Sequence, residues 1–407
     1  MADRGRYIAP RMRIAYLTHY AELYGANRSL LDLMCALRDA GAVEPYVLLP
    51  REGPLTERLS AEGITWRTVP WQPWMSERHY MGGPHHRLGQ YLRHARAARE
   101  RSRTNAALAP TLLEYLRAWR IDAVHVNSAA VGITGELLDR WSGPLIWHIR
   151  EMPEGHYGLH LDMGTRRYGA LLRKAARVIA ISNAVRNDVQ RYAGTRTSVD
   201  VIYNGVVTKA DHARQALAAH ERWEHPEPFT FLMAGLIHPS KGQLEAVRAL
   251  ARLHAGHPSA RLVIAGDGRA DALRKLVTAL GLSDHVELTG FVKDMAPLLR
   301  RAHALLNCSR NEAMGRITVE AMASGLPVIG HNSGGTPELI THGRNGLLYP
   351  GGDEALAERM AELADNVERA RALGTQALRD AVERFSVERY AEEVLEVYRS
   401  VLSRASA

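Results

Sequence analysis

Short apolar runs alternate with longer amphipathic stretches along most of the chain. The runs are bounded by Gly, Pro, Asn or Asp, and the stretches between them carry apolar residues at a helical spacing. This alternation predicts an α/β fold in which helices cover parallel sheets. The predicted strands of the first half are Arg13–Leu17, Pro45–Leu49, Ile64–Val69, Ala123–Val126, Pro144–Ile149 and Val178–Ile181, with helices such as Asn27–Ala40 and Ala107–Arg117 between them.

The second half repeats the alternation after a polar segment, 209–228, that has no strand pattern. We therefore predict two doubly wound, Rossmann-like domains that face a cleft, with ligands outside the carboxyl ends of the strands. The domains are expected at 1–206 and 207–385, followed by a helix at 386–407 that crosses back to the N-terminal domain. The predicted strands are Thr230–Ala234, Arg261–Ala265, His285–Leu288, Ala304–Asn307 and Pro327–Ile329, and the helices include Gln243–His254 and Asp271–Leu280.

The composition, with 46% hydrophobic and 24% charged residues, is typical of a globular enzyme. A formal net charge of +8 suits phosphorylated ligands, an anionic membrane surface or nucleic acid. Cys35 and Cys308 are the only two cysteines, which excludes a disulfide framework and a cysteine-based zinc site. Residues 1–10 lack the apolar core of a signal peptide, and no apolar run is long enough to span a membrane. We expect a cytoplasmic protein that can lie peripherally at the inner face of the cell membrane.

Much of the positive charge is concentrated in an insertion at 71–110. It contains seven arginines against two glutamates, with Trp71, Trp74, Tyr80 and Tyr91 interleaved. One interpretation is a solvated insertion with a basic helix. The other is a surface that binds anionic lipid headgroups or a lipid-diphosphate acceptor. The length of the insertion favours the second interpretation.

The loop that contains Glu312 carries the most informative polar residues. It follows a predicted strand, and a helix is expected to begin near Gly315. The backbone N–H groups of Met314, Gly315 and Arg316 then point out of the helix N-terminus, where an anion is favoured. Glu312 and Glu320 can accept hydrogen bonds from the hydroxyls of a sugar and a ribose. Alternatively, Glu312 caps the helix and Glu320 faces solvent.

A second strand-to-helix loop, at 234–242, ends with a cation. Lys241 lies just before the helix Gln243–His254, where its charge opposes the helix dipole by about 0.3 kcal/mol or more. A bound phosphate would reverse the sign of this effect, and the same holds for Arg316. Two cations at two helix N-termini predict a diphosphate site, unless Lys241 is simply exposed to solvent.

Two residues of the first half complete the candidate site. Gly25 joins the first strand to a helix and allows a ligand to approach the backbone. His148 is near the end of the strand Pro144–Ile149 and is expected to face the crevice between the domains. Each can also be a purely structural residue.

Together these loops resemble the retaining glycosyltransferases of family 4, which have the GT-B fold. The spacing of Glu312 and Glu320 and the segment 321–329 after them are similar to the signature of that family. The resemblance covers nearly the whole chain and is weaker at 71–110. Further similar segments are Lys241–Gln243, Gly266–Gly268, Gly290–Phe291, Ser333–Ile340, Asn345–Leu348, Ser182–Val185 and Ile202–Val206.

The resemblance implies a role for each matching residue. Glu312 binds hydroxyls of the donor sugar, Glu320 holds the ribose, and Lys241 neutralises the diphosphate. From the N-terminal domain, His148 contacts the donor sugar and Gly25 lies beside the phosphates. The other residues expected to bind the donor are Ala313, Met314, Gly315 and Arg316, with Phe291 and Val292 lining the base.

One position departs from the family pattern, because Leu236 stands where the family usually has Arg. We hypothesise that Arg316 or a basic residue of the N-terminal domain supplies the missing charge. No Asp-x-Asp motif occurs in the chain, so no carboxylate pair for a diphosphate-bound metal is apparent. We expect neither a metal nor another cofactor, and charge on the leaving diphosphate is then stabilised by Lys241 and helix N-termini.

The predicted function is therefore retaining transfer of a hexose or N-acetylhexosamine from a UDP- or GDP-linked donor. The expected acceptor is a saccharide or a lipid-linked saccharide of cell-surface polysaccharide or glycolipid biosynthesis. Two alternatives remain open: a nucleotide-sugar epimerase on a related fold, and a non-catalytic nucleotide-sugar-binding family member. Nucleic acid is not an expected partner, because the excess positive charge lies mainly in one insertion.

Overall fold

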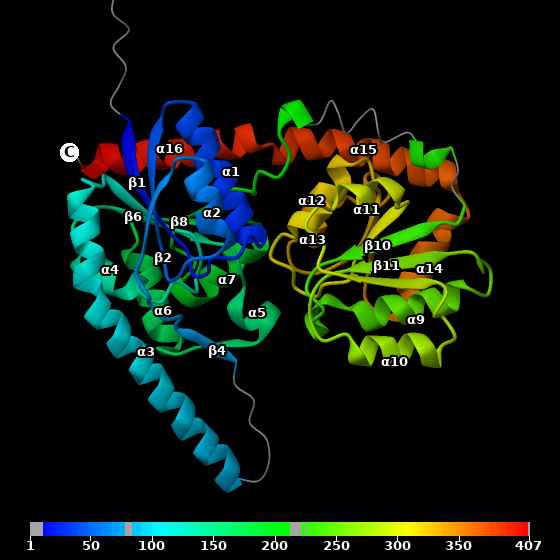
Figure 1. Ribbon diagram of the computed structural model, residues 1–407, viewed down its shortest axis with the longest axis horizontal. Helices are drawn as coiled ribbons and strands as arrows, with labels where there is room; N and C mark the ends of the chain where they lie inside the picture. The colour runs from blue at the N-terminus through cyan, green and yellow to red at the C-terminus, as the bar shows by residue number, and fades with distance from the viewer. Residues whose placement is uncertain (1–10, 78–83, 212–220, 225–226, 406–407) are drawn as a thin grey trace, which may run out of the picture.

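The computed structural model describes residues 11–77, 84–211, 221–224 and 227–405. It contains two parallel sheets, each covered by helices, which form two domains side by side (Figure 1). This is the predicted architecture of two Rossmann-like domains.

The N-terminal sheet has seven strands in the order β3-β2-β1-β5-β6-β8-β9, and all neighbours are parallel. Apolar residues of α1, α2 and α16 pack on one face, and those of α3, α4, α6 and α7 pack on the other. The bounds of the strands are Met12–Leu17 (β1), Val43–Leu49 (β2), Thr65–Thr68 (β3), Ala123–Val126 (β5), Leu145–Ile149 (β6), Arg177–Ala180 (β8) and Val199–Val201 (β9). Those of the helices are Gly25–Asp39 (α1), Pro54–Ala61 (α2), Pro84–Ala118 (α3), Thr134–Arg140 (α4), Gly164–Lys174 (α6), Asn183–Ala193 (α7) and Val387–Ala405 (α16).

The C-terminal sheet has six parallel strands in the order β12-β11-β10-β13-β14-β15. Helices α9, α10 and α14 pack on one face, and α11, α12, α13 and the second half of α15 pack on the other. The strands are Thr230–Ala234 (β10), Arg261–Ala265 (β11), Val286–Gly290 (β12), Ala304–Asn307 (β13), Val328–His331 (β14) and Gly346–Tyr349 (β15). The helices are Gln243–Leu253 (α9), Asp271–Ala279 (α10), Ala296–Arg301 (α11), Arg316–Ala323 (α12), Thr336–Leu339 (α13), Asp353–Ala364 (α14) and Val367–Phe385 (α15), preceded by short 3-10 turns at Glu221–Trp223 and Pro239–Lys241.

Four predicted strands have the predicted bounds, and the others differ by one or two residues at either end. The sequence pattern did not predict β9, β15 or a small antiparallel pair formed by β4 (Met75–Glu77) and β7 (Leu159–Leu161). These strands have only three or four residues, too few for an alternation of apolar and polar residues to stand out.

The insertion at 71–110 differs most from the prediction. The predicted helix Ala107–Arg117 is only the end of α3, a helix of 35 residues that passes through Pro110 and projects from the domain (Figure 1). Trp71 and Trp74 are 2% and 4% exposed, so they belong to the core and not to a surface that could bind lipid. Tyr91 is 53% exposed on α3, and Tyr80 lies outside the described residues.

The chain crosses between the domains twice, at 202–207 and at Ser386, where a β-bridge joins Val207 to Ser386. After the second crossing, α16 packs against α1 and the N-terminal sheet. Tyr390 of α16 accepts a hydrogen bond of 2.7 Å from Arg150, and the Tyr398 hydroxyl lies 2.7 Å from His125 Nδ1. The last helix is therefore part of the N-terminal domain.

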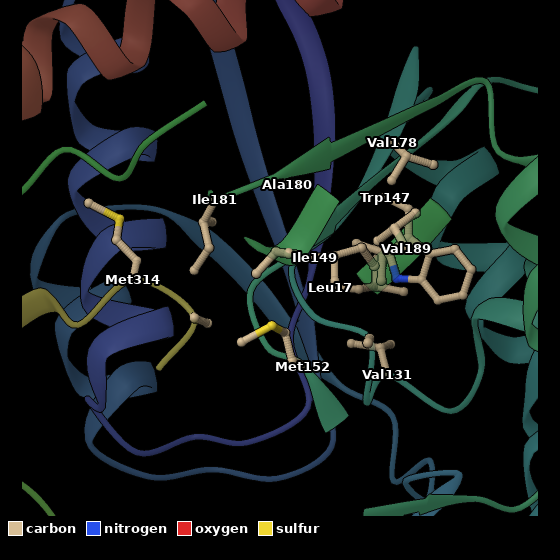
Figure 2. Close-up of a cluster of buried hydrophobic side chains, with 14 of the residues drawn as sticks. Leu17, Val131, Trp147, Ile149, Met152, Val178, Ala180, Ile181, Val189 and Met314 are labelled. Atoms are coloured by element: carbon tan, nitrogen blue, oxygen red, sulfur yellow. The ribbon is translucent and has the colours of Figure 1, made fainter. Parts of the chain in front are cut away.

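Two further contacts fix how the domains face each other. Met314, from the C-terminal domain, joins an apolar cluster with Ile181 and Met152 of the N-terminal domain (Figure 2). The carboxylate of Glu338 accepts hydrogen bonds of 2.7 and 2.8 Å from the backbone N–H groups of Asn183 and Ala184, at the N-terminus of α7. A negative charge at a helix N-terminus is favourable, so this carboxylate stabilises the domain contact as well as the helix.

Candidate functional site

Lys241 and Glu312 follow β10 and β13, the two strands between which the strand order of the C-terminal sheet reverses. Loops from such neighbouring strands diverge and leave a crevice at the carboxyl edge of the sheet. Here Lys241 Nζ lies 2.5 Å from Glu312 Oε2, and the two side chains are only 17% and 13% exposed. The structure thus brings together the two charged residues that the sequence placed in separate loops.

Glycines allow these loops to approach each other. Gly242 has a φ of +76°, and a Cβ there would lie 2.7 Å from Cβ of Cys308 at the end of β13. A Cβ on Gly335 would lie 2.3 Å from the carbonyl oxygen of Ala313, and the Gly335 N–H donates to Glu312 O at 2.7 Å. A larger residue at Gly242 would push the Lys241 loop away from Cys308, and a larger residue at Gly335 would displace the Glu312 loop.

The N-terminal domain contributes a histidine that the sequence analysis did not single out. Helix α5 (Pro153–Tyr157) follows β6 and places His156 Nε2 3.9 Å from Glu312 Oε2. His156 is 7% exposed, and burial lowers its pKa to about 4, against the opposing effect of Glu312. The imidazole is therefore neutral at pH 7 and can donate one hydrogen bond and accept another.

Glu312 remains ionised beside these two groups. Burial raises the pKa of its carboxyl, but the charge of Lys241, with further contributions from His156 and Ser309, outweighs burial, and the resulting pKa is below the usual value. An ionised carboxylate accepts hydrogen bonds only, which suits the hydroxyls of a sugar. Lysine, carboxylate and neutral imidazole thus meet where the two domains face each other.

The low pKa of His156 predicts that the protein loses stability in mild acid. Between about pH 6.5 and about 4, the unfolded chain binds a proton on this residue that the folded chain does not. The free energy of unfolding then falls by about 2 kcal/mol between neutral pH and about pH 5. We expect the urea midpoint to fall less over this range in His156→Asn than in the wild type. Equal falls in the two proteins would contradict the assignment.

Other buried groups also affect how the stability of the protein changes with pH. Burial also lowers the pKa values of His125 and His148 well below the usual value, so they act in the same direction as His156. Burial raises the pKa values of Asp32 and Glu151, which act in the opposite direction. Only the difference between His156→Asn and wild type therefore isolates His156.

Arg316 and Glu320, the residues expected at the diphosphate and ribose, form a second charged cluster on α12. Glu320 Oε1 lies 3.0 Å from both Arg28 Nη2 and Arg316 Nε, and Arg316 Nη2 lies 2.9 Å from Asp32 Oδ2. Gly25 borders the cluster, because a Cβ there would be 3.8 Å from Cβ of Arg316. A diphosphate would have to compete with these carboxylates for Arg316, whose proposed replacement of the missing family Arg stays a prediction.

The loop before α12 presents its backbone to the crevice. Gly315 is the N-cap, with a φ of +79°, and the helix begins at Arg316. Within the described part of the chain, the N–H groups of Met314, Gly315 and Arg316 donate to no carbonyl or side chain. Ala313 and Met314 are 5% and 1% exposed, so both residues are part of the contact between the domains.

Phe291 and Val292 follow β12, at the same edge of the sheet. Phe291 is 69% exposed, unusually high for a large apolar side chain, and Leu236 after β10 is 50% exposed. An exposed aromatic ring at this edge of the sheet offers a stacking surface for a base.

His148 does not lie where we expected it. It is fully buried, and its Nδ1 lies 3.3 Å from His125 Nε2, beneath Tyr390 of α16. Alternate residues of a strand point to opposite faces, and His148 shares with Ile146 the face of β6 that α16 covers. The expectation that His148 faces the crevice is therefore wrong, and His156 occupies that place.

Two family models match the chain, one on each domain. The model described as Glycosyltransferase Family 4 matches residues 24–210, and that described as Glycosyl transferases group 1 matches residues 217–380. The chain belongs to glycosyltransferase family 4. Its fold is accordingly the GT-B fold of this family.

Similar proteins come from several bacteria. The family 4 chain is 30% identical to the spore coat protein SA of Bacillus subtilis over 55% of its length and 64% of that protein. It is also 30% identical to the D-inositol 3-phosphate glycosyltransferase of Streptomyces avermitilis over 69% of its length and 66% of that protein. The match thus spans less than two thirds of either curated relative. The crystal structure of Anabaena HepE in complex with UDP and glucose superposes with a TM-score of 0.74 at 25% identity, covering 96% of this chain and all of HepE.

Within the described residues of this family 4 chain, no group of three or more His, Cys, Asp and Glu is placed to hold a metal ion. Among the same residues, every helix is too short or too polar to cross a membrane.

Proposed function

We propose that the protein transfers a hexose or N-acetylhexosamine from a UDP- or GDP-linked donor to a saccharide or lipid-linked acceptor, with retention of configuration and without a metal. The observation that carries this proposal is the meeting of Lys241, Glu312 and His156 at the switch point of the C-terminal sheet. Family membership and the similarity to HepE, solved with UDP and glucose, support the choice of donor.

A nucleotide-sugar donor would bind across these residues. Its base would stack near Phe291, and its diphosphate would lie between Lys241 and the free N–H groups before α12. The sugar would then reach Glu312 from the C-terminal domain and His156 from the N-terminal domain. The Lys241–Glu312 pair would open as diphosphate and sugar hydroxyls replace each partner.

The proposed chemistry needs no protein nucleophile. The bond between the anomeric carbon and the diphosphate oxygen breaks, and the diphosphate leaves with the electron pair. The acceptor oxygen bonds to the anomeric carbon on the same face, and its proton passes to an oxygen of the leaving phosphate. Lys241 and the N–H groups stabilise the negative charge that develops on the diphosphate, while Glu312 and His156 position the sugar.

We also propose a cytoplasmic location and peripheral contact with an anionic membrane through α3. The exposed part of this helix carries arginines beside Leu88, Tyr91 and Leu92, which are 58%, 53% and 58% exposed. Such a combination of charge and apolar surface favours an anionic interface.

A panel of UDP- and GDP-sugars tests the proposed function by thermal shift, followed by product analysis with chelator present. At 100 times its Kd, the correct donor adds about 2.7 kcal/mol of stability. The same donor should then give a retained glycoside and free nucleoside diphosphate. Conversion of donor to an epimer without acceptor would identify an epimerase, and binding without turnover over a broad acceptor panel would identify a non-catalytic protein. Activity that is abolished by chelator would contradict the metal-free mechanism.

A further inference from the structure

A pocket of 510 Å³ lies in the N-terminal domain, outside the candidate donor site. It is bounded by one face of α3, the loop before α4, and the segment from β7 into α6. Trp74, Tyr91, Leu161 and Met163 supply apolar and aromatic walls, and Gly132 and Gly135 form part of its boundary. No step of the proposed transfer uses this pocket.

The pocket continues along α3 as an exposed apolar stripe. Tyr91, Ala95, Ala98 and Ser102 line the pocket and follow each other at spacings of three and four residues, so they share one face of the helix. One turn earlier, Leu88 lies on the same face and is 58% exposed, where the helix projects from the domain (Figure 1). From Leu88 to Ser102 this face of the helix is roughly 20 Å long, which suits an extended chain better than a compact sugar.

The charges around the pocket favour an anion at its mouth. Arg101 is paired with Asp162 at 2.6 Å, and Arg167 with Asp139 at 2.7 Å. Arg99, which also lines the pocket, has no hydrogen bond or ion pair with any residue that the structure describes. Glu136, the other acidic residue of the lining, is paired with Arg140 at 2.9 Å. Arg99 is thus a cation of the lining that has no counter-ion among the described residues, and it lies beside the apolar walls of the pocket.

The pocket is close enough to the transfer site for one acceptor molecule to reach both. Its wall residue Leu161 ends β7, which directly follows α5 with His156. Five residues of extended chain span at most roughly 18 Å. A phosphate and a short saccharide can bridge that distance from the pocket to a sugar held between His156 and Glu312.

We infer that this pocket and the α3 stripe bind the lipid phosphate of a lipid-linked acceptor. The apolar chain lies along Leu88, Tyr91 and Ala95, and the phosphate pairs with Arg99. This inference deepens the proposed function and rests on it for the identity of the pocket as an acceptor site. The projecting end of α3 then receives the lipid from the membrane surface while the saccharide reaches the reaction centre.

Calorimetric titration of the full chain with dodecyl phosphate, below its micelle concentration, tests this inference. The amphiphile should bind, and inorganic phosphate and the neutral dodecyl maltoside should bind at least about tenfold more weakly, because each lacks one of the two interactions. Equal binding of dodecyl maltoside would show that the site binds any detergent through the apolar chain alone, and would overturn the inference. Equal binding of inorganic phosphate would show a simple anion site and overturn it too.

Matched variants on α3 locate the site. Ala95→Phe fills the pocket and should weaken dodecyl phosphate binding about tenfold or more, whereas Ala107→Phe, exposed on the same helix and outside the pocket, should not change it. Arg99→Gln should weaken binding about tenfold, and Arg103→Gln, which removes the same charge outside the pocket, should change it less than about twofold. Equal losses in the two alanine variants would show a general effect on folding, and equal losses in the two arginine variants would show a general effect of charge. Either result would overturn the inference.

Donor binding by the same variants separates this inference from the proposed function. Nucleotide-sugar thermal shifts should match the wild type in Ala95→Phe and Arg99→Gln, because neither residue lies in the donor site. Loss of amphiphile binding with donor binding intact is the expected result. If dodecyl phosphate fails to bind the wild type while a donor binds and turns over, the pocket assignment is wrong and the proposed transfer stands.

Discussion

Glu312→Gln is expected to lower kcat for sugar transfer by about 100- to 1,000-fold. The carboxylate is 13% exposed and ionised, so it can accept charge-assisted hydrogen bonds from two sugar hydroxyls. In the proposed transfer, its negative charge would also stabilise the positive charge that develops at the anomeric carbon in the transition state. The amide keeps the shape of the side chain but loses the charge. Initial rates of nucleoside diphosphate release, with the donor found by thermal shift, measure the effect.

The matched control is Glu358→Gln, the same substitution at an exposed position of α14. It should retain wild-type turnover. Glu312→Gln leaves Lys241 without its carboxylate and can therefore lower the melting temperature, so the rates are compared at a temperature where circular dichroism shows both variants folded. If the folded Glu312→Gln variant turns over within about threefold of the wild-type rate, Glu312 has no important role in the reaction.

The parts of the fold that could be predicted from sequence have local signals. Strands such as β10 and β13 are apolar runs that end at Gly, Asn or Ser, so their bounds were predictable. The loops holding Lys241 and Glu312 were predictable for the same reason, since each directly follows such a strand. Their meeting also follows from the topology, because the strand order of a doubly wound sheet reverses between the first strand and the fourth.

The parts that could not be predicted depend on contacts between distant segments. Whether His148 faces the crevice depends on which face of β6 is covered by α16, more than 200 residues away in the chain. The approach of His156 to Glu312 depends on how the domains face each other, which no local pattern encodes. A neutral histidine soon after a strand that borders the cleft was the available signal, and the resemblance drew attention to His148 instead.

The same limit explains the different environment of Arg316. From sequence it is a cation at a helix N-terminus, equivalent to Lys241. In the structure its neighbours Asp32 and Ser29 come from α1 of the other domain. A long-range ion pair therefore gives one cation a role in joining the domains and leaves the other with Glu312 at the crevice.

Lys241→Ala should lower kcat/KM for the donor by about 100-fold or more and weaken binding of the nucleoside diphosphate product about tenfold or more. The ammonium is the cation nearest to the proposed diphosphate and is mostly buried, so its interaction with phosphate is poorly screened. The loss of Lys241 also removes the charge that counters the burial of Glu312, so the pKa of Glu312 rises. The acid limb of the pH–rate profile, which requires ionised Glu312, should move to higher pH.

Lys241→Arg provides the control, because it keeps a cation near Glu312 and should leave that acid limb close to its wild-type position. Lys241 and Glu312 contact each other, so their effects on the rate should not add. The double variant Lys241→Ala, Glu312→Gln should lose less than the product of the two single losses, because each single variant leaves the other residue without its partner and the double variant does not. Unchanged product binding in Lys241→Ala would show that Lys241 does not contact the diphosphate, and the site would then have to be built around some other cation. Fully additive losses in the double variant would show that the two residues act independently of each other.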